Sequence, residues 1–179
     1  GKVIPYKKMF GPMPASIFHA PFPAPENGIS EEDALRGLEM IFKADIDPSE
    51  VAAMIVEPVQ GEGGFHQLTP SFAKKLREIC DQHGIVLIFD EVQCGFGRTG
   101  TLFATEQLGV EPDLITSAKS LAGGFPISAL MGRAEVMDAP LPGGLGGTYA
   151  GSPLGTTAAL KVLEIIEEEN PFENLGIQY

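Results

Sequence analysis

The feature that most constrains the fold is an uninterrupted apolar run, Ile85-Val86-Leu87-Ile88-Phe89, which ends on Asp90 and Glu91. A run without polar alternation is typical of a strand covered on both faces, as in a parallel sheet with helices on each side. A helical pattern from Thr69 to Gly84 precedes it, with an N-cap residue at its start and a glycine at its end. The sequence therefore predicts a buried strand that presents charged side chains at its carboxyl end.

Strand and helix patterns alternate along the rest of the chain. Short apolar runs bounded by Pro, Gly or charged residues predict strands, whereas apolar residues at helical spacing after a capping residue predict helices. Such alternation indicates an α/β fold with a mainly parallel sheet flanked by helices. The expected elements are a helix near 31–43, strands over 51–56, 113–118 and 127–131, and a long helix from Ser152-Pro153 to Glu167-Glu168-Glu169.

The first 28 residues form a different kind of segment. They hold six of the chain's 15 prolines, each of which removes a backbone donor and favours extended geometry in the residue before it. We expect residues 1–28 to be irregular and to depend on the rest of the chain for their packing.

Composition excludes several kinds of partner. Acidic residues number 24 against 12 basic ones, and the resulting charge of −12 repels nucleic-acid backbones and anionic membrane surfaces. No apolar run approaches the roughly 20 residues needed to span a bilayer, and the first five residues lack the apolar core of a signal peptide. Cys80 and Cys94 are too few for a disulfide scaffold and lie in no zinc-binding pattern. We therefore expect a cytoplasmic protein with no metal, no nucleic acid and no membrane partner.

Three residues with ionisable side chains follow predicted strands: Glu57, Asp90 and Lys119. Ligands of such sheets bind at the carboxyl ends of the strands, so we expect these side chains on one rim. A carboxylate that directly follows five apolar residues is partly desolvated and needs a cation or strong donors beside it. Asp90 could therefore neutralise a cationic cofactor ring, or could serve only as a helix cap or in a structural ion pair.

Lys119 lies among small residues, in Ser117-Ala118-Lys119-Ser120-Leu121-Ala122-Gly123-Gly124. An amine that loses hydration at the end of an apolar strand is more often neutral and nucleophilic, although a surface lysine extending past a loop fits the same pattern. The pairing with Asp90 favours the chemical role. A pyridine aldehyde cofactor requires an amine that bonds to its aldehyde and a carboxylate that keeps its ring nitrogen protonated.

The phosphate group of such a cofactor would need a separate cradle. Gly146-Gly147-Thr148-Tyr149 offers flexible backbone amides and a hydroxyl, but Gly-rich turns often serve geometry alone. Gly61-Glu62-Gly63-Gly64 is a weaker candidate, because it carries an acid and lacks the Lys-Ser/Thr of a P-loop.

Four segments in order resemble the class III aminotransferases, which depend on pyridoxal phosphate and have the fold-type I architecture. They are Glu57 to Gly64, Asp90 to Gly100, Ala118 to Gly124 and Gly146 to Tyr149. Four motifs in register are far more specific than any one of them, and the resemblance covers nearly the whole chain. It is strongest to the bacterial members of this family that act on 4-aminobutyrate.

The resemblance implies a role for each matching residue. Lys119 corresponds to the Schiff-base lysine, which also carries the proton, and Asp90 to the partner of the pyridinium nitrogen. Val92 corresponds to the residue that packs on one face of the ring, and Gln93 to the residue that hydrogen-bonds its phenolic oxygen. Thr148 corresponds to a phosphate ligand donated to the neighbouring subunit's cofactor, which implies a homodimer or a higher homo-oligomer.

Glu57 is similar to the glutamate that pairs with a substrate-binding arginine when an ω-amino acid binds, and releases it for the α-carboxylate of glutamate. The resemblance thus implies transamination between 4-aminobutyrate and 2-oxoglutarate, giving succinate semialdehyde and glutamate. An acetylornithine or ornithine aminotransferase is the alternative within the family.

Members of this family are much longer than this chain. The parts expected to be missing are an amino-terminal segment with a phosphate-binding turn and a carboxyl-terminal small domain with the arginine opposite Glu57. Residues 1–179 are accordingly expected to be the central part of the large, cofactor-binding domain. Such a fragment is expected to be inactive by itself, and a non-catalytic folded module is the alternative for the chain as it stands.

Overall fold

The computed structural model describes residues 3–169 and 171–174, and the strands among them form one four-stranded sheet. The strands are β1 (Ala53–Val56), β2 (Val86–Asp90), β3 (Leu114–Ser117) and β4 (Ala129–Gly132), and they lie in that order across the sheet. β1, β2 and β3 are parallel, whereas β4 is antiparallel to β3. The sheet therefore has the mainly parallel character that the sequence predicts.

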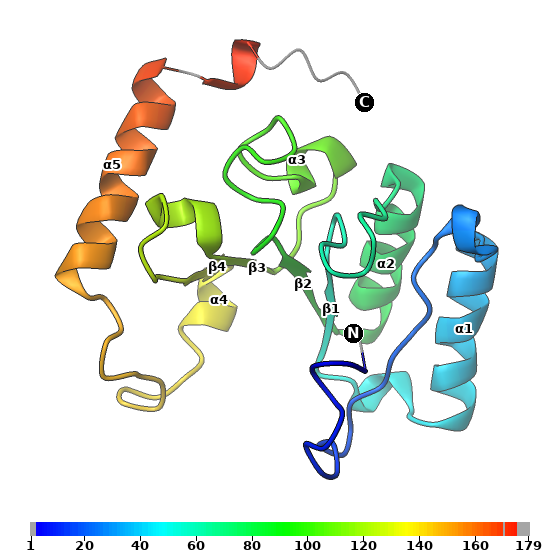
Figure 1. Ribbon diagram of the computed structural model, residues 1–179. Helices are drawn as coiled ribbons and strands as arrows, with labels where there is room; N and C mark the ends of the chain where they lie inside the picture. Colours follow the sequence, from blue (N-terminus) through cyan, green and yellow to red (C-terminus); the bar gives the residue numbers. More distant parts are fainter. Residues whose placement is uncertain (1–2, 170, 175–179) are drawn as a thin grey trace.

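Helices flank this sheet (Figure 1). In Figure 1, α1 and α2 lie beside each other near β1, and α5 lies beyond β4 at the other end of the sheet. No helix in the described part of the chain is long and apolar enough to cross a membrane. The α-helices are α1 (Glu31–Ala44), α2 (Pro70–His83), α3 (Thr105–Leu108), α4 (Ala134–Met137) and α5 (Pro153–Glu169), and the 3₁₀ helices are η1 (Pro25–Asn27), η2 (Pro48–Glu50), η3 (Lys119–Ala122) and η4 (Pro171–Asn174).

Local capping explains where α1 and α2 begin and end. The Ser30 hydroxyl accepts a hydrogen bond from the Asp33 N–H, and the Asp33 carboxylate accepts one from the Ser30 N–H. α2 begins after Thr69, whose hydroxyl accepts from the Phe72 N–H, and ends at Gly84, which has a left-handed φ of 69°. Both helices agree with the sequence prediction to within one residue.

α1 and α2 cover one face of the sheet. Leu87 and Phe89 of β2 are fully buried and belong to the same apolar cluster as Leu38 of α1 and Leu76 of α2. Full burial of one such side chain stabilises a fold by about 1.5–3 kcal/mol. This cluster therefore fixes where β2 lies, and with it the residues that follow β2.

The opposite face of the sheet is more open than the apolar run 85–89 predicts. Burial alternates along β2, where Leu87 and Phe89 are buried and the residues between and beside them are half-buried. The strand register places Ile55 and Leu130 on the more open face, where they are 61% and 45% exposed. The prediction that this strand is covered on both faces is therefore wrong for this chain, because the helices of the apolar cluster lie on the Leu87 side.

The antiparallel β4 follows from the length of the connection before it. Only residues 118–128 separate β3 from β4, whereas a parallel crossover needs a dozen or more residues, usually including a helix. Gly132 also brings the two strands close together, because a Cβ there would lie 2.2 Å from the Asp113 carbonyl oxygen.

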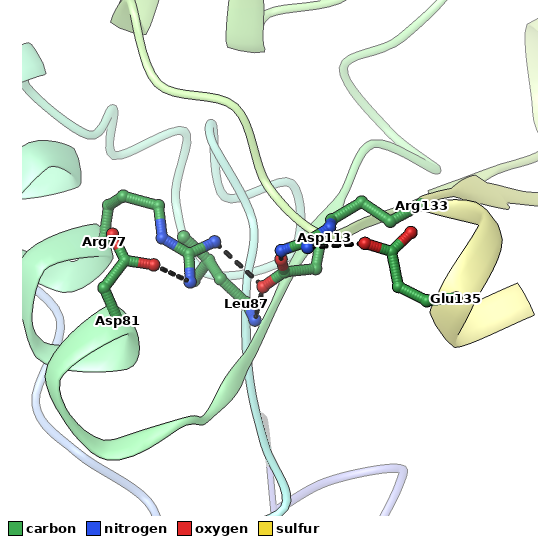
Figure 2. Close-up of polar contacts among 6 residues, drawn as sticks. All are labelled: Arg77, Asp81, Leu87, Asp113, Arg133 and Glu135. Carbon is green, nitrogen blue, oxygen red and sulfur yellow. Dashed lines mark hydrogen bonds and ion pairs between the residues drawn. The ribbon is translucent and has the colours of Figure 1, made fainter. Parts of the chain in front are cut away.

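An ion-pair cluster joins α2, β2 and the end of β4 at the amino end of β3 (Figure 2). Asp113 Oδ2 accepts hydrogen bonds from the Leu87 N–H at 2.7 Å and from Arg77 at 2.8 Å, and Oδ1 accepts one from Arg133 at 2.9 Å. Burial by itself would raise the pKa of Asp113, but these hydrogen bonds hold it below its ordinary value. The cluster holds the strands together at the end of the sheet opposite the rim where the predicted site residues lie.

Candidate active site

The carboxyl ends of β1, β2 and β3 bring three predicted site residues to one edge of the sheet. Val56 pairs with Phe89, so Glu57 lies level with Asp90 at the ends of neighbouring strands. Asp90 pairs with Thr116, and Lys119 follows three residues later, at the start of η3. Glu57, Asp90 and Lys119 therefore share the rim, as the sequence predicts.

The Asp90 carboxylate is fixed by neutral donors. Its Oδ1 accepts hydrogen bonds from the Thr116 hydroxyl at 2.9 Å and from the Val92 N–H at 3.1 Å. No ion pair among the described residues includes Asp90, which argues against the structural ion pair that the sequence left open. Both hydrogen bonds go to Oδ1, so Oδ2 can accept from a ligand above the rim.

Lys119 has a strained backbone and a fixed amine. Its φ of +47° is in the left-handed region, which residues with a Cβ rarely adopt. Lys119 Nζ donates a hydrogen bond to Gln93 Oε1 across the rim. The residue is exposed, so the predicted loss of hydration is wrong for this chain, and the hydrogen bond rather than burial orients the amine.

The loop after β2 carries Val92 and Gln93, and a buried carboxylate holds this loop in place. Glu91 is 1% exposed and accepts hydrogen bonds from the Ala104 N–H at 2.9 Å and the Thr105 N–H at 2.7 Å. No role for Glu91 was predicted from the sequence. The only signal was its position beside Asp90, because the donors that satisfy it come 13 and 14 residues later.

A second contact joins this loop to η3, which begins at Lys119. Arg98 donates a hydrogen bond to the Ser120 hydroxyl at 2.7 Å, next to Lys119 in the chain. Sequence reasoning also missed Arg98, since an exposed arginine in a Gly-rich loop gives no indication of its acceptor. Two hydrogen bonds, from Lys119 to Gln93 and from Arg98 to Ser120, therefore join the loop after β2 to η3.

Glu57 is half-buried and is held by the loop that follows it. Its Oε2 accepts a hydrogen bond from the Gly61 N–H at 2.8 Å. The Gln60 N–H donates to the His66 carbonyl at 2.8 Å, and the Leu68 N–H donates to the Pro58 carbonyl, so the loop returns to the sheet. The Glu57 carboxylate thus has a defined orientation at the rim.

Thr148 lies away from these contacts, in an exposed turn between α4 and α5. The Ala150 N–H closes this turn on the Gly147 carbonyl at 3.0 Å. The described residues show no hydrogen bond from Thr148 to Asp90, Gln93 or Lys119. Its predicted role on a neighbouring subunit's phosphate therefore stays a prediction.

The two cysteines are unsuited to nucleophilic chemistry. Burial, together with the neighbouring Glu91 carboxylate, raises the pKa of the Cys94 thiol to about 12, and burial raises that of Cys80 to about 11. Within residues 3–169 and 171–174, no group of three or more His, Cys, Asp or Glu side chains could hold a metal ion.

Comparison with known proteins gives the family of this chain. The aminotransferase class-III family matches residues 1–176. The 4-aminobutyrate aminotransferase GabT of Escherichia coli is 59% identical over 170 residues, which are 95% of this chain and 40% of the relative. The 5-aminovalerate aminotransferase DavT of Pseudomonas aeruginosa is 60% identical over 173 residues, 97% of this chain and 41% of the relative.

A solved structure agrees in fold. An (S)-enantioselective ω-transaminase from Thermomicrobium roseum has a TM-score of 0.83 and 34% identity, over 93% of this chain and 40% of that one. The fold and the rim thus define an α/β domain of the transaminase type. With almost its whole length matched, the chain belongs to the class-III aminotransferases. It spans about two-fifths of the length of the relatives it matches.

Proposed function

We propose that the full-length protein containing this chain transfers the amino group of 4-aminobutyrate to 2-oxoglutarate, giving succinate semialdehyde and glutamate, with pyridoxal phosphate as cofactor. One observation carries the proposal: a lysine amine oriented by Gln93 lies on the same rim as a carboxylate with one free oxygen. The 59% identity to a 4-aminobutyrate aminotransferase supports the choice of substrate.

The residues at the rim fit this cofactor. Asp90 Oδ2 would accept the ring N–H, while the bonds from Thr116 and Val92 keep Oδ1 in place. Val92 would pack on a ring face and the Gln93 amide would donate to the phenolic oxygen. Bound pyridoxal phosphate supplies an electron-accepting ring that stabilises the charge left when a proton leaves the substrate carbon.

The chain's own residues hold and move the proton. Lys119 Nζ would take the proton from the substrate carbon and return it to a neighbouring atom. Gln93 Oε1 fixes the direction of Nζ through the hydrogen bond between them. The left-handed backbone of Lys119 turns its side chain from the end of β3 toward this loop.

Glu57 would set the substrate range. Its carboxylate lies level with Asp90 and is held by the Gly61 N–H. We propose that Glu57 pairs with an arginine from another part of the full-length protein when an ω-amino acid binds, and releases it for glutamate. Because a relative named for 5-aminovalerate is as similar as the one named for 4-aminobutyrate, 5-aminovalerate is the competing donor.

We also propose the assembly in which this site works. Residues 1–179 would be the central part of a large cofactor-binding domain, completed by an amino-terminal segment and a carboxyl-terminal small domain. Two such subunits would form a cytoplasmic homodimer in which Thr148 serves the neighbouring subunit's phosphate. The exposure of Thr148 supports the last point, and two free buried cysteines fit a reducing compartment.

The test uses the full-length protein. It should show the visible absorbance band of a lysine-bound cofactor, and Lys119→Ala should remove it. Rates with 4-aminobutyrate, 5-aminovalerate, ornithine and acetylornithine then rank the donors. A band that persists in Lys119→Ala would reject the role of this lysine, and a faster reaction with ornithine or acetylornithine would reject the proposed donor.

For residues 1–179 expressed alone, a non-catalytic folded module is the second candidate. The exposed Lys119 and the open sheet face support it, since such a site does not exclude water. Borohydride trapping of added pyridoxal phosphate on Lys119 without turnover would identify a binding module, and turnover would identify an enzyme.

A further inference from the structure

We propose that Gly61 is a positioning residue that couples Glu57 to Gln93, so that the carboxylate that selects the substrate and the amide that orients Lys119 cannot move independently. The proposal rests on the proposed function and adds a specificity-determining contact to it. Three contacts in series carry it, and each involves a different atom or surface of the residues concerned.

The first contact joins Gly61 to Glu57. The Gly61 N–H donates to Glu57 Oε2 at 2.8 Å, four residues back in the chain. When Glu57 turns toward an arginine, this N–H loses its acceptor. Release of Glu57 would therefore leave the Gly61 N–H to find another acceptor.

The second contact joins Gly61 to Gln93. A Cβ on Gly61 would lie 2.7 Å from Gln93 Cγ, 3.2 Å from Cδ and 3.3 Å from Cβ. The φ of Gly61 is outside the left-handed region, so its backbone would accept a side chain. Close packing on Gln93, and not backbone geometry, is therefore what requires glycine here.

The third contact joins Gln93 to Lys119, through the hydrogen bond from Nζ to Oε1. The atoms that a Gly61 methyl would meet are in the middle of the Gln93 side chain. Gln93 could avoid the methyl only by rotating, which moves Oε1 away from Lys119. Otherwise the loop that contains Gly61 must move away from Gln93, and this movement would distort the hydrogen bond from the Gly61 N–H to Glu57 Oε2.

Gly63 provides a matched control in the same loop. A Cβ there would meet Gln60, at 2.4 Å from the terminal Oε1, 2.7 Å from Cδ and 3.1 Å from Cβ, so Gln60 would have to shift, but it is a different side chain from Gln93. The end of a glutamine side chain can swing aside, and Gln60 makes no side-chain hydrogen bond to Glu57, Gln93 or Lys119 among the described residues. Gly63→Ala thus perturbs the loop without touching the proposed coupling.

The experiment is a double-mutant cycle in the full-length protein loaded with pyridoxal phosphate, using Gly61→Ala, Gln93→Ala, the double variant and Gly63→Ala. Three quantities are measured: the pH midpoint of the cofactor absorbance, the cofactor dissociation constant and the melting temperature. The kcat/KM values for 4-aminobutyrate and for glutamate are measured beside them.

Gly61→Ala should shift the absorbance midpoint and lower kcat/KM by about ten- to a hundredfold, as small misplacements of reacting groups do. Gly63→Ala should stay within about twofold of the parent, given that a flexible side-chain end absorbs it. In the Gln93→Ala background, adding Gly61→Ala should change nothing further, because the methyl then enters vacated space.

Additive effects of Gly61→Ala and Gln93→Ala, or a Gly61→Ala protein with the parent's spectrum and rates, would overturn the proposal. If Gly61→Ala fails to fold, the double variant should fold, and its failure would also count against the steric contact. A parent that binds no cofactor would reject the proposed function instead, while the melting temperatures of the cycle would still report the Gly61–Gln93 contact.

Discussion

Asp90 and Glu91 are adjacent in the chain, but the Asp90 carboxylate lies at the rim and the Glu91 carboxylate is buried in the loop. Asp90 is held at the rim by Thr116 and Val92, whereas Glu91 is buried and satisfies the N–H groups of Ala104 and Thr105. The last residue of β2 thus presents a carboxylate to a ligand, and the next residue uses its carboxylate to hold the loop beside it.

Glu91→Ala should lower the free energy of unfolding by roughly 2–4 kcal/mol, because it leaves the buried Ala104 N–H and the partly buried Thr105 N–H without acceptors. Denaturant unfolding of the full-length protein measures this. Glu106→Ala is the control, since Glu106 accepts a single hydrogen bond from the Phe103 N–H in the same loop but is exposed. Equal losses in the two variants would contradict the role of Glu91.

Thr116→Val should weaken cofactor binding by about tenfold, which corresponds to about 1.4 kcal/mol for a hydrogen bond to a charged group. The change removes the hydroxyl that donates to Asp90 Oδ1 and keeps the shape of the side chain. Thr116→Ser retains the hydroxyl and should bind as the parent does. Titration of the apoprotein with pyridoxal phosphate gives the dissociation constants, and unchanged binding in Thr116→Val would be the contrary result.

Asp113→Asn should lower the free energy of unfolding at neutral pH by about 3 kcal/mol, at the lower end for a buried ion pair because Arg133 is 57% exposed. The pKa of Asp113 in the folded protein lies below its ordinary value of 3.8. The stability that its carboxylate contributes is therefore fully present above pH 3.8, and it is lost as the pH falls through the folded-state pKa. The difference between variant and parent should therefore shrink below about pH 4.

The control for this prediction is Asp81→Asn. Asp81 pairs with Arg77 at 2.9 Å on the outer side of the cluster and is 65% exposed (Figure 2). Its loss should change stability by no more than about 1 kcal/mol. A pH-independent difference for Asp113→Asn would show that packing, and not charge, holds the cluster.

Cys80 and Cys94 should resist iodoacetamide at pH 8 in the folded protein and react once it is unfolded. Burial raises their pKa values to about 11 and about 12, so almost no thiolate is present. Mass spectrometry counts the added groups in each state. Rapid labelling of Cys94 before unfolding would contradict its burial.

The sequence predicted α1 and α2 well because their ends are set locally. A capping residue such as Ser30 or Thr69 and a terminal glycine such as Gly84 act within four residues of the helix end. The placement of Glu57, Asp90 and Lys119 on one rim was likewise predictable, since parallel strands align their carboxyl ends.

What the sequence missed depends on contacts between distant segments. The N–H donors to Glu91, the packing of Gly61 on Gln93 and the exposure of Lys119 are set by how loops fold over the sheet. Apolar residues alone do not tell which face of a strand is covered, so the open face around Ile55 was not foreseen.

The left-handed backbone of Lys119 implies that the protein gives up some folding stability to keep a lysine at this position. Asparagine or glycine would adopt that conformation with less penalty, whereas an ordinary side chain there costs about 1–2 kcal/mol. A lineage selected only for heat resistance would be expected to replace the lysine. Its retention would then be a mark of selection for chemistry.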